Sequence, residues 1–154
     1  MSGFSKALKL NSIYLGVEEN VVKKRFPQGL LGVSGVHKAL VIHALCENTG
    51  KRAFVITPDE AAAGKMVDDL VSLGTSAQLL PAKDISFISD QTRSREYEQQ
   101  RVGTLANWLK HDCKVVVLPA YSAVEKTLPP RSLAAKIRTI SSGDEMELDL
   151  LLRT

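Results

Sequence analysis

Hydrophobic positions along this chain follow two different spacings, and each spacing is typical of one kind of element. Near the N-terminus, Val17, Val21 and Val22 recur at helical spacing. This pattern predicts a helix that starts at Ser12, after a short turn over Lys6–Leu10. Beyond residue 26, short apolar runs alternate with longer stretches of helical periodicity. The change predicts that the main body contains both strands and helices.

Four short apolar runs have the length and residue types of buried strands. They are Leu30–Val33, Ala53–Ile56, Ala77–Leu80 and Val115–Leu118. The helical stretches between them are Lys38–Cys46, which ends near Gly50, a second that ends at Gly74, and a third over Arg95–Lys110. Strands separated by helices are typical of parallel sheets with right-handed crossovers. We therefore predict an α/β fold, with helices on both faces of a parallel sheet.

The second helical stretch has the clearest start signal in the chain. Thr57, Pro58 and Glu60 fit a capping box, with Thr57 as the N-cap and Pro58 at the first helical position. We expect this helix to bury the apolar face formed by Ala63, Met66, Val67, Leu70 and Val71. In the third stretch, the positions expected to face inward are Val102, Leu105, Ala106, Trp108 and Leu109. Pro81–Ser94 is predicted to be a long loop.

The character of the sequence changes at Leu128-Pro129-Pro130, which predicts a domain boundary. Lys136–Ile140 is predicted to be an edge strand, and a second capping box over Ser142–Glu145 opens an acidic helix that reaches the last residue. Because that helix has no C-cap, we expect the chain to belong to a longer polypeptide. We divide it into a helical segment over residues 1–26, an α/β lobe over residues 27–133 and the start of a second small domain over residues 134–154.

Composition places the chain among ordinary globular proteins. Of its 154 residues, 44% are hydrophobic and 24% charged, and the net charge of +3 is too small for a dedicated nucleic-acid binder. The apolar runs are far shorter than the roughly 18 residues of a membrane span, and the N-terminus lacks a signal core. We expect a cytoplasmic protein with no membrane partner. Cys46 and Cys113 have no metal-binding spacing and are expected to be buried thiols.

One segment has the position of a phosphate-binding loop, between the first predicted strand and the next helix. A working loop has the pattern G-x-x-x-x-G-K-[ST], in which glycines bring backbone N–H groups to the phosphates and the hydroxyl holds Mg²⁺. Gly32, Gly35 and Lys38 fit this pattern. His37 replaces the second signature glycine, and Ala39 replaces the metal-binding hydroxyl. Two defining positions are therefore lost.

Three interpretations of this loop stay open. It is an active ATPase loop, a vestigial loop that still holds an anion at a helix N-terminus, or a purely structural turn. The strand Val115–Leu118 runs into Pro119-Ala120, where an ATPase carries acidic residues for Mg²⁺. We therefore expect no catalytic residue, no cofactor and no metal, and the candidate anion site consists of Gly32, Gly35, His37 and Lys38.

Other patterns in the sequence favour structural roles. The three histidines, His37, His43 and His111, have no ligand spacing with either cysteine and are expected to be buried or capping residues. Glu96 and Glu98, with Arg93, Arg95 and Arg101 nearby, indicate surface ion pairs, and Trp108 fits a core face better than a base-stacking platform. Lys23, Lys24 and Arg25 fit a solvated helix end, with weak single-strand nucleic-acid binding as the alternative.

The ordered set of segments resembles the N-terminal region of bacterial transcription-repair coupling factor (Mfd), over about residues 10–154. The matching segments are Gly32–Lys38, Val55–Asp59, Leu80–Asp84, Ser94–Arg101, Val116–Ala120 and Leu128–Pro130. In that family the region is similar to the first lobe of the excision-repair subunit UvrB, whose loop has the sequence G-V-T-G-S-G-K-T. Gly32, Val33, Gly35 and Lys38 agree with that loop, while His37 and Ala39 depart from it.

The resemblance implies a degenerate P-loop NTPase or helicase-like lobe that has lost its ATPase. It also implies a parent protein that is an ATP-dependent DNA translocase, recognises stalled RNA polymerase and recruits the damage sensor UvrA for nucleotide excision repair. RNA polymerase and DNA would be bound by parts absent here, and Ala135–Thr154 would be only the start of the UvrA-binding domain. Asp84–Ser94 contains no tyrosine, unlike the DNA-gripping hairpin of UvrB.

We therefore expect a non-catalytic module that contacts UvrA and other domains of the parent protein. The alternative is the nucleotide-binding lobe of an ATP-dependent DNA helicase, inactive as a fragment.

Overall fold

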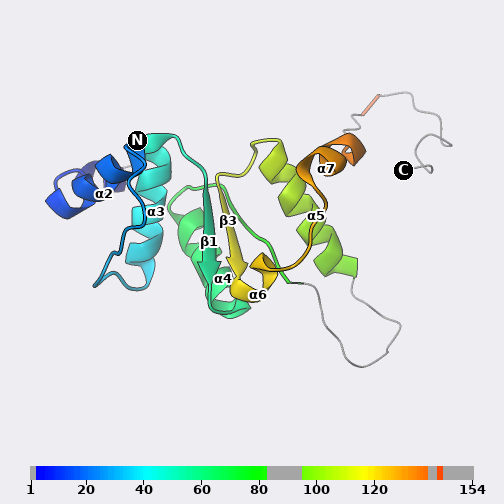
Figure 1. The fold of residues 1–154 in the computed structure, drawn as a ribbon, viewed down its shortest axis with the longest axis horizontal. Coiled ribbons are helices and arrows are strands. Elements are labelled where there is room, and N and C mark those ends of the chain that lie inside the picture. Colours follow the sequence, from blue (N-terminus) through cyan, green and yellow to red (C-terminus); the bar gives the residue numbers. More distant parts are fainter. Residues whose placement is uncertain (1–2, 83–94, 139–141, 144–154) are drawn as a thin grey trace.

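A three-stranded parallel sheet forms the centre of the described chain (Figure 1). The computed structural model describes residues 3–82, 95–138 and 142–143. The strands are β1 (Ala53–Thr57), β2 (Ala77–Leu79) and β3 (Val115–Pro119), in the order β1-β3-β2, with Ala53 and Ala77 both aligned with Val115. All five residues of β3 are buried, as expected for the middle strand of a parallel sheet. The predicted parallel α/β architecture is confirmed.

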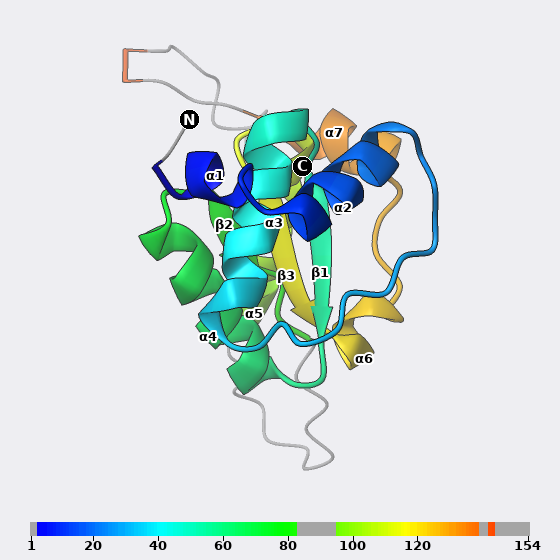
Figure 2. The same cartoon turned by 90° about the vertical axis from the view of Figure 1, so that its left-hand side faces the viewer.

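Helices cover both faces of the sheet, as predicted. The described helices are α1 (Gly3–Leu8), α2 (Ser12–Val22), α3 (Val36–Thr49), α4 (Glu60–Ser72), α5 (Arg95–Leu109), α6 (Ala120–Ala123) and α7 (Pro130–Lys136). α3 and α4 pack on one face and α5 on the other, while α1 and α2 lie outside α3 (Figure 2). The sheet thus separates two hydrophobic cores.

The larger core lies between the sheet and the pair α3 and α4. Alternate residues of the middle strand, Val115 and Val117, meet fully buried residues of both helices, among them Ala39 and Leu70. The smaller core lies on the opposite face, where Val116 and Leu118 pack beneath α5. This alternation follows from the two-residue period of a strand, which sends successive side chains to opposite faces.

The first predicted strand, Leu30–Val33, is absent, and this corrects the sequence analysis. The segment forms neither strand nor helix, and Leu31 is 95% exposed. An apolar run becomes a strand only where a neighbouring strand accepts its hydrogen bonds, and no periodicity in the run itself specifies that neighbour. Among the described residues β1 pairs only with β3, so the predicted phosphate loop does not follow a strand.

Helix starts and faces differ from prediction at several residues. The N-cap of α4 is Asp59, whose side chain accepts the Ala62 N–H at 2.7 Å, and not Thr57, whose hydroxyl donates to the Asp59 carbonyl instead. Val71 and Val102 are each 53% exposed, although both were predicted to face inward. Their helical spacing is compatible with the core face, but each lies at its margin.

Other helix predictions hold. α2 starts at Ser12, and α3 ends at Thr49 with Gly50 as its C-cap, in the left-handed conformation that favours glycine. α1, however, already begins at Gly3 and ends at Leu8, so it replaces the turn predicted over Lys6–Leu10.

The C-terminal predictions are only partly within the described residues. Lys136 ends α7 and residues 137–138 belong to no strand, so the predicted edge strand over Lys136–Ile140 does not start there. The rest of that strand, most of the Pro81–Ser94 loop and the acidic helix after Ser142 lie outside the described residues. The division at residues 26 and 133 stays a prediction. In the described part of the chain, no helix has the length and apolarity needed to span a membrane.

Candidate anion site at the start of the third helix

Two glycines shape the turn that precedes α3. Gly32 has φ 79° and Gly35 has φ 51°, in the left-handed region that residues with a Cβ adopt at a cost. Gly35 is the N-cap residue of α3, and no side chain caps this helix start. The glycines therefore serve the turn itself, whether or not the turn binds anything.

Some backbone groups of this turn are already used by the turn. The N–H of His37 donates to the Ser34 carbonyl at 3.2 Å, and the N–H of Lys38 donates to the Gly35 carbonyl at 3.1 Å. The His37 ring nitrogen Nδ1 lies 3.2 Å from the same Ser34 oxygen. Two N–H groups that a phosphate would need thus have internal partners.

The predicted site residues lie together at the end of the sheet where α/β proteins bind ligands. Figure 1 shows the start of α3 at the same end as the carboxyl termini of β1 and β3. Gly32, Gly35, His37 and Lys38 are all exposed. The exposed Lys38 ammonium and the partial positive charge of the α3 N-terminus can attract an anion.

The position of the missing metal-binding hydroxyl is buried. Ala39 has no exposed surface and packs in the larger core with Cys46, Ala63 and Leu70. A hydroxyl placed there would lie among apolar side chains. β3 runs directly into α6 at Pro119-Ala120, as the sequence indicated, and no group of three or more His, Cys, Asp or Glu in the described chain is arranged to hold a metal ion.

A buried arginine at the carboxyl end of the sheet was missed in the sequence, where Arg101 was interpreted as a surface residue. Arg101 is 6% exposed. Its Nη1 donates to the Pro81 carbonyl and to Ser122 Oγ, each at 2.7 Å, and lies 2.9 Å from the Glu125 carboxylate. Arg101 therefore ties α5 to α6 and to the segment after β2. The available signal was its spacing, because Arg101 lies three and seven residues before the core-facing positions Thr104 and Trp108.

Trp108 lies where α5 approaches β1, and it is partly exposed. The Arg52 guanidinium lies 4.0 Å from the centre of its ring, and the Phe54 ring centroid lies at 4.4 Å. Arg52 also donates to the Trp108 carbonyl at 2.5 Å. The predicted core role is confirmed, because Trp108 packs against the smaller core.

The expectation of buried histidines is correct for His43 and wrong for His37 and His111, which are exposed. His43 is buried, and its Nδ1 lies 2.7 Å from Thr75 Oγ1 while its Nε2 lies 3.4 Å from Glu47. Glu47 also accepts from Ser5, so this polar network fastens α1 to α3. Cys46 and Cys113 are buried free thiols, and burial raises the pKa of each.

A shallow groove of about 380 Å³ follows the outer edge of β2. Gln78, Gln100, Thr104 and Asn107 supply its polar atoms, and Asn107 donates to Gln78 at 3.1 Å.

The basic residues Lys23, Lys24 and Arg25 are exposed after α2, and Lys23 pairs with Glu19 on the same helix. This matches the predicted solvated helix end.

The comparison with known proteins gives one similarity. The chain is 28% identical, over 145 residues, to the transcription-repair-coupling factor of Bacillus subtilis (strain 168). The aligned region is 92% of this chain and 12% of that protein, so the chain spans about an eighth of its relative. No protein-family model and no solved structure matches the chain.

Proposed function

We propose that this chain is a non-catalytic, UvrB-like recruiting module related to the N-terminal part of transcription-repair coupling factors. The observation that carries the proposal is the 28% identity to such a factor along 92% of the chain. A match of that extent reaches both cores and the connecting turns, and it therefore supports a common ancestry for the whole lobe rather than for one motif.

The turn before α3 supports the non-catalytic part of the proposal. The His37 and Lys38 N–H groups have internal partners, and position 39 is buried in the core. A phosphate loop needs these N–H groups and a hydroxyl that faces the nucleotide. Titration with a fluorescent ATP analogue and Mg²⁺ is expected to show no turnover. Micromolar binding accompanied by hydrolysis would contradict this part of the proposal.

The partner proposed for the module is UvrA. We would immobilise the chain and measure binding of purified UvrA by biolayer interferometry, with an unrelated α/β domain of similar size as the control. A chimera carrying the residues that follow the aligned region in the Bacillus relative is measured in parallel. We expect micromolar or tighter binding by the chimera, because the family resemblance assigns most UvrA contacts to the next domain. If neither protein binds UvrA, the recruiting role is wrong.

A second candidate is the nucleotide-binding lobe of an ATP-dependent helicase. It is favoured by the position of the Gly32–Lys38 turn at the carboxyl end of the sheet. The test is His37→Gly combined with Ala39→Ser, since serine adds less volume than threonine at this buried position. Nucleotide binding that appears in the double variant, and is lost again with Lys38→Ala, would favour a vestigial nucleotide site. No gain would favour a structural turn.

A further inference from the structure

β1 has one open edge. The Ala53 N–H donates to the Lys114 carbonyl of the neighbouring segment, so the backbone of Ala53 points toward β3. Because backbone N–H and C=O groups alternate in direction along a strand, those of Val55 and Thr57 also point toward β3. The backbone groups of Phe54 and Ile56 therefore point away from the sheet, and no strand in the described part of the chain pairs with them.

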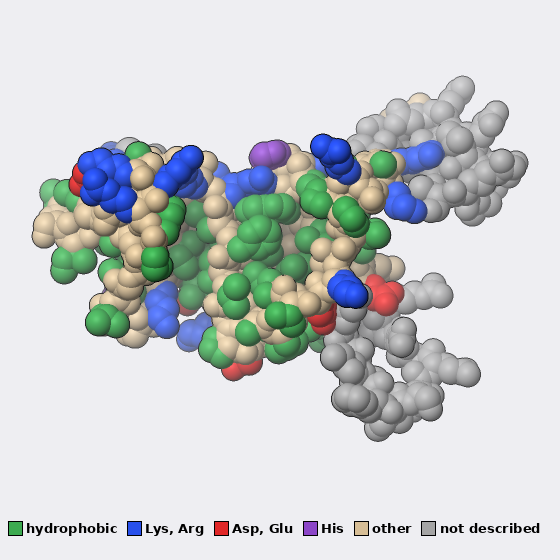
Figure 3. Space-filling view, in the orientation of Figure 1, with side chains coloured by type: hydrophobic (Ala, Val, Ile, Leu, Met, Phe, Trp, Pro, Cys, Tyr) green, Lys and Arg blue, Asp and Glu red, His purple; other side chains and the backbone are tan. Residues whose placement is uncertain are grey.

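The same two residues present exposed apolar side chains. Phe54 is 53% exposed and Ile56 is 62% exposed, although their neighbours in register, Val116 and Leu118, are buried beneath α5. α5 covers the middle of this face, and its Trp108 ring lies 4.4 Å from the Phe54 ring of β1. Figure 3 shows hydrophobic side chains gathered in the centre of the view, between the positions of α3 and α5 in Figure 1. A solvent-exposed strand edge with apolar side chains is a template for another strand.

The two edges of the sheet differ in their surroundings. The β2 edge is flanked by α4 and α5, whose side chains form the polar groove described above. On the β1 side stand α2 and the segment 23–35, which together we call the N-terminal arm (Figures 1 and 2). The arm carries exposed apolar residues of its own, including Leu31 at 95% and Phe26 at 64%.

We propose that the open edge of β1 binds one extended peptide segment of a partner protein, which adds a strand and carries apolar side chains at alternate positions. This mode of recognition takes affinity from main-chain hydrogen bonds and specificity from alternate side chains. Phe54 and Ile56 supply the outward-facing N–H and C=O groups for those bonds. Their side chains supply contacts for one face of the incoming strand.

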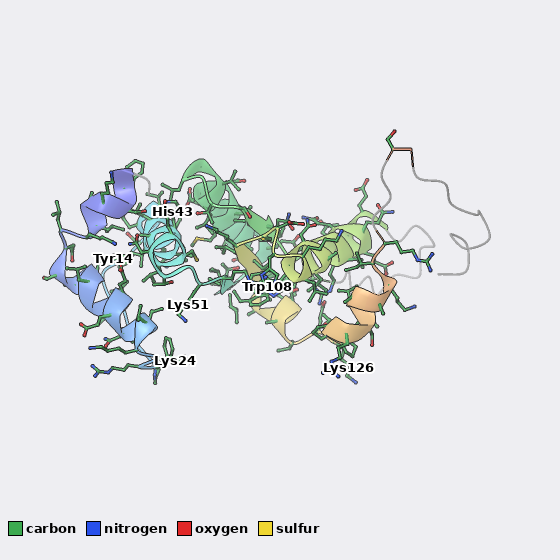
Figure 4. The ribbon with its side chains drawn as sticks, turned by 90° about the horizontal axis from the view of Figure 1, so that it is seen from above. Tyr14, Lys24, His43, Lys51, Trp108 and Lys126 are labelled. Carbon is green, nitrogen blue, oxygen red and sulfur yellow. The ribbon has the colours of Figure 1, made fainter. Side chains whose placement is uncertain are left out.

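Charges at the two ends of β1 define the polarity of the partner segment. Lys51 is exposed immediately before the strand, and Asp59 is exposed immediately after it. Figure 4 shows Lys51 beside α3 and Trp108 beside α5. The matching segment carries a carboxylate beside Lys51 and a basic residue beside Asp59. Carboxylates at both ends of the segment would place like charges beside Asp59.

A second copy of this chain fits the edge less well. Antiparallel pairing of two β1 strands would place Lys51 of each copy beside Asp59 of the other. The β3 strand of the second copy would then lie roughly 10 Å from β1 of the first, one strand spacing beyond the paired strand. The N-terminal arm stands on that side (Figure 2). A lone extended segment avoids this conflict. Single-stranded nucleic acid fits less well too, because Ile56 offers no aromatic face and Arg52 is engaged with Trp108.

The experiment is a selection from a phage library of random peptides on the intact chain alone, after which the binding of the enriched peptides to Ile56→Pro is measured. Proline removes only the outward-facing N–H of Ile56 and leaves the bonds to β3, so the fold is retained. We expect enriched peptides with alternating apolar residues and about tenfold weaker binding to Ile56→Pro. Ile56→Thr keeps the N–H and is the matched variant, with a smaller loss expected. Circular dichroism and a urea midpoint verify that each variant is folded.

Amide hydrogen exchange gives the direct readout. In the free protein, the amides of Val55 and Thr57 are expected to exchange slowly because they bond β3, and those of Phe54 and Ile56 are expected to exchange fast. A selected peptide is expected to slow Phe54 and Ile56. The proposal is wrong if the peptides bind without protecting these amides, if Ile56→Pro binds them equally well, or if no peptide is enriched. It is also wrong if the chain dimerises through this edge, or if oligo-dT protects these amides in place of a peptide.

Discussion

Buried polar residues hold this small fold together at defined points. Arg101 neutralises Glu125 and also satisfies the Pro81 carbonyl and the Ser122 hydroxyl. His43 joins Thr75 to Glu47 in the same way on the other side of the sheet. In each case the side chain connects segments that lie far apart in the sequence. Removing one partner of such a contact lowers the free energy of unfolding strongly, because the other partner stays buried without it.

Arg101→Leu is therefore expected to be strongly destabilising. The substitution removes the Arg101 guanidinium from the Glu125 carboxylate, whose side chain is 15% exposed, and we expect the free energy of unfolding to fall by about 3 kcal/mol. Urea denaturation followed by circular dichroism measures the change. Arg131→Leu, at an exposed position of α7, is the matched control and is expected to change stability by less than about 0.5 kcal/mol. Equal effects of the two substitutions would show that the Arg101 contacts contribute little.

The two thiols predict a loss of stability in alkaline solution. Burial raises the pKa of Cys46 and of Cys113, so both stay protonated in the folded chain at a pH where they ionise in the unfolded chain. Below the unfolded pKa, about 8.5, they contribute no pH dependence, and above it the unfolded state is favoured. The free energy of unfolding is expected to fall as the pH rises above about 8.5. A double variant with Cys46→Ala and Cys113→Ala should show a smaller fall; an identical fall would assign the effect to other groups.

At the scale of elements, periodicity predicted what lies inside each helix better than where each helix begins. Four of the five predicted core-facing residues of α4 follow from spacing, because a 3.6-residue repeat defines one face, and only Val71 at its margin does not. The N-cap did not follow, since Thr57 and Asp59 are both good capping residues and only the direction of the chain leaving β1 decides between them. The prediction of a strand at Leu30–Val33 was wrong for a similar reason. Whether a segment finds a pairing strand depends on the whole sheet and not on the segment alone.

Replacing glycine by alanine is expected to have opposite effects on stability at two positions of the chain. Gly50→Ala places a Cβ on a residue with φ 67° and should destabilise the chain by about 1 kcal/mol. Gly16→Ala, in the exposed middle of α2 where a Cβ meets nothing, should stabilise it by about 0.5–1 kcal/mol. Thermal unfolding followed by circular dichroism distinguishes the two. Two shifts of the same sign would contradict the backbone conformation at one of these glycines.

At the scale of the whole molecule, the N-terminal arm is attached differently from the sheet. α2 meets α3 through a few contacts, among them hydrogen bonds from Asn48 to Tyr14 and Glu18, whereas residues 23–32 are exposed throughout. The candidate anion site lies at the end of this exposed segment. Its residue identities were predictable from a motif, but its exposure was not, because a motif contains no information about what packs around it.

Limited proteolysis tests this difference in attachment. Among the described residues, trypsin is expected to cut first after Lys23, Lys24 or Arg25, since an exposed irregular segment adapts to a protease without unfolding the rest. Lys65 is the control, because it is exposed but lies within α4, which must open before cleavage. Mass spectrometry of early digests identifies the cuts. Cleavage after Lys65 at the same rate would show that the arm is held as firmly as the sheet.

The fluorescence of Trp108 reports on only one face of the sheet. Trp108 is the sole tryptophan of the sequence, and its ring touches β1 and the smaller core while the larger core lies behind the sheet. Its emission therefore records the polarity on the α5 face alone. If the two cores lose their packing at different urea concentrations, the fluorescence curve and the far-ultraviolet curve will separate. The same emission responds to any molecule that displaces water beside Phe54.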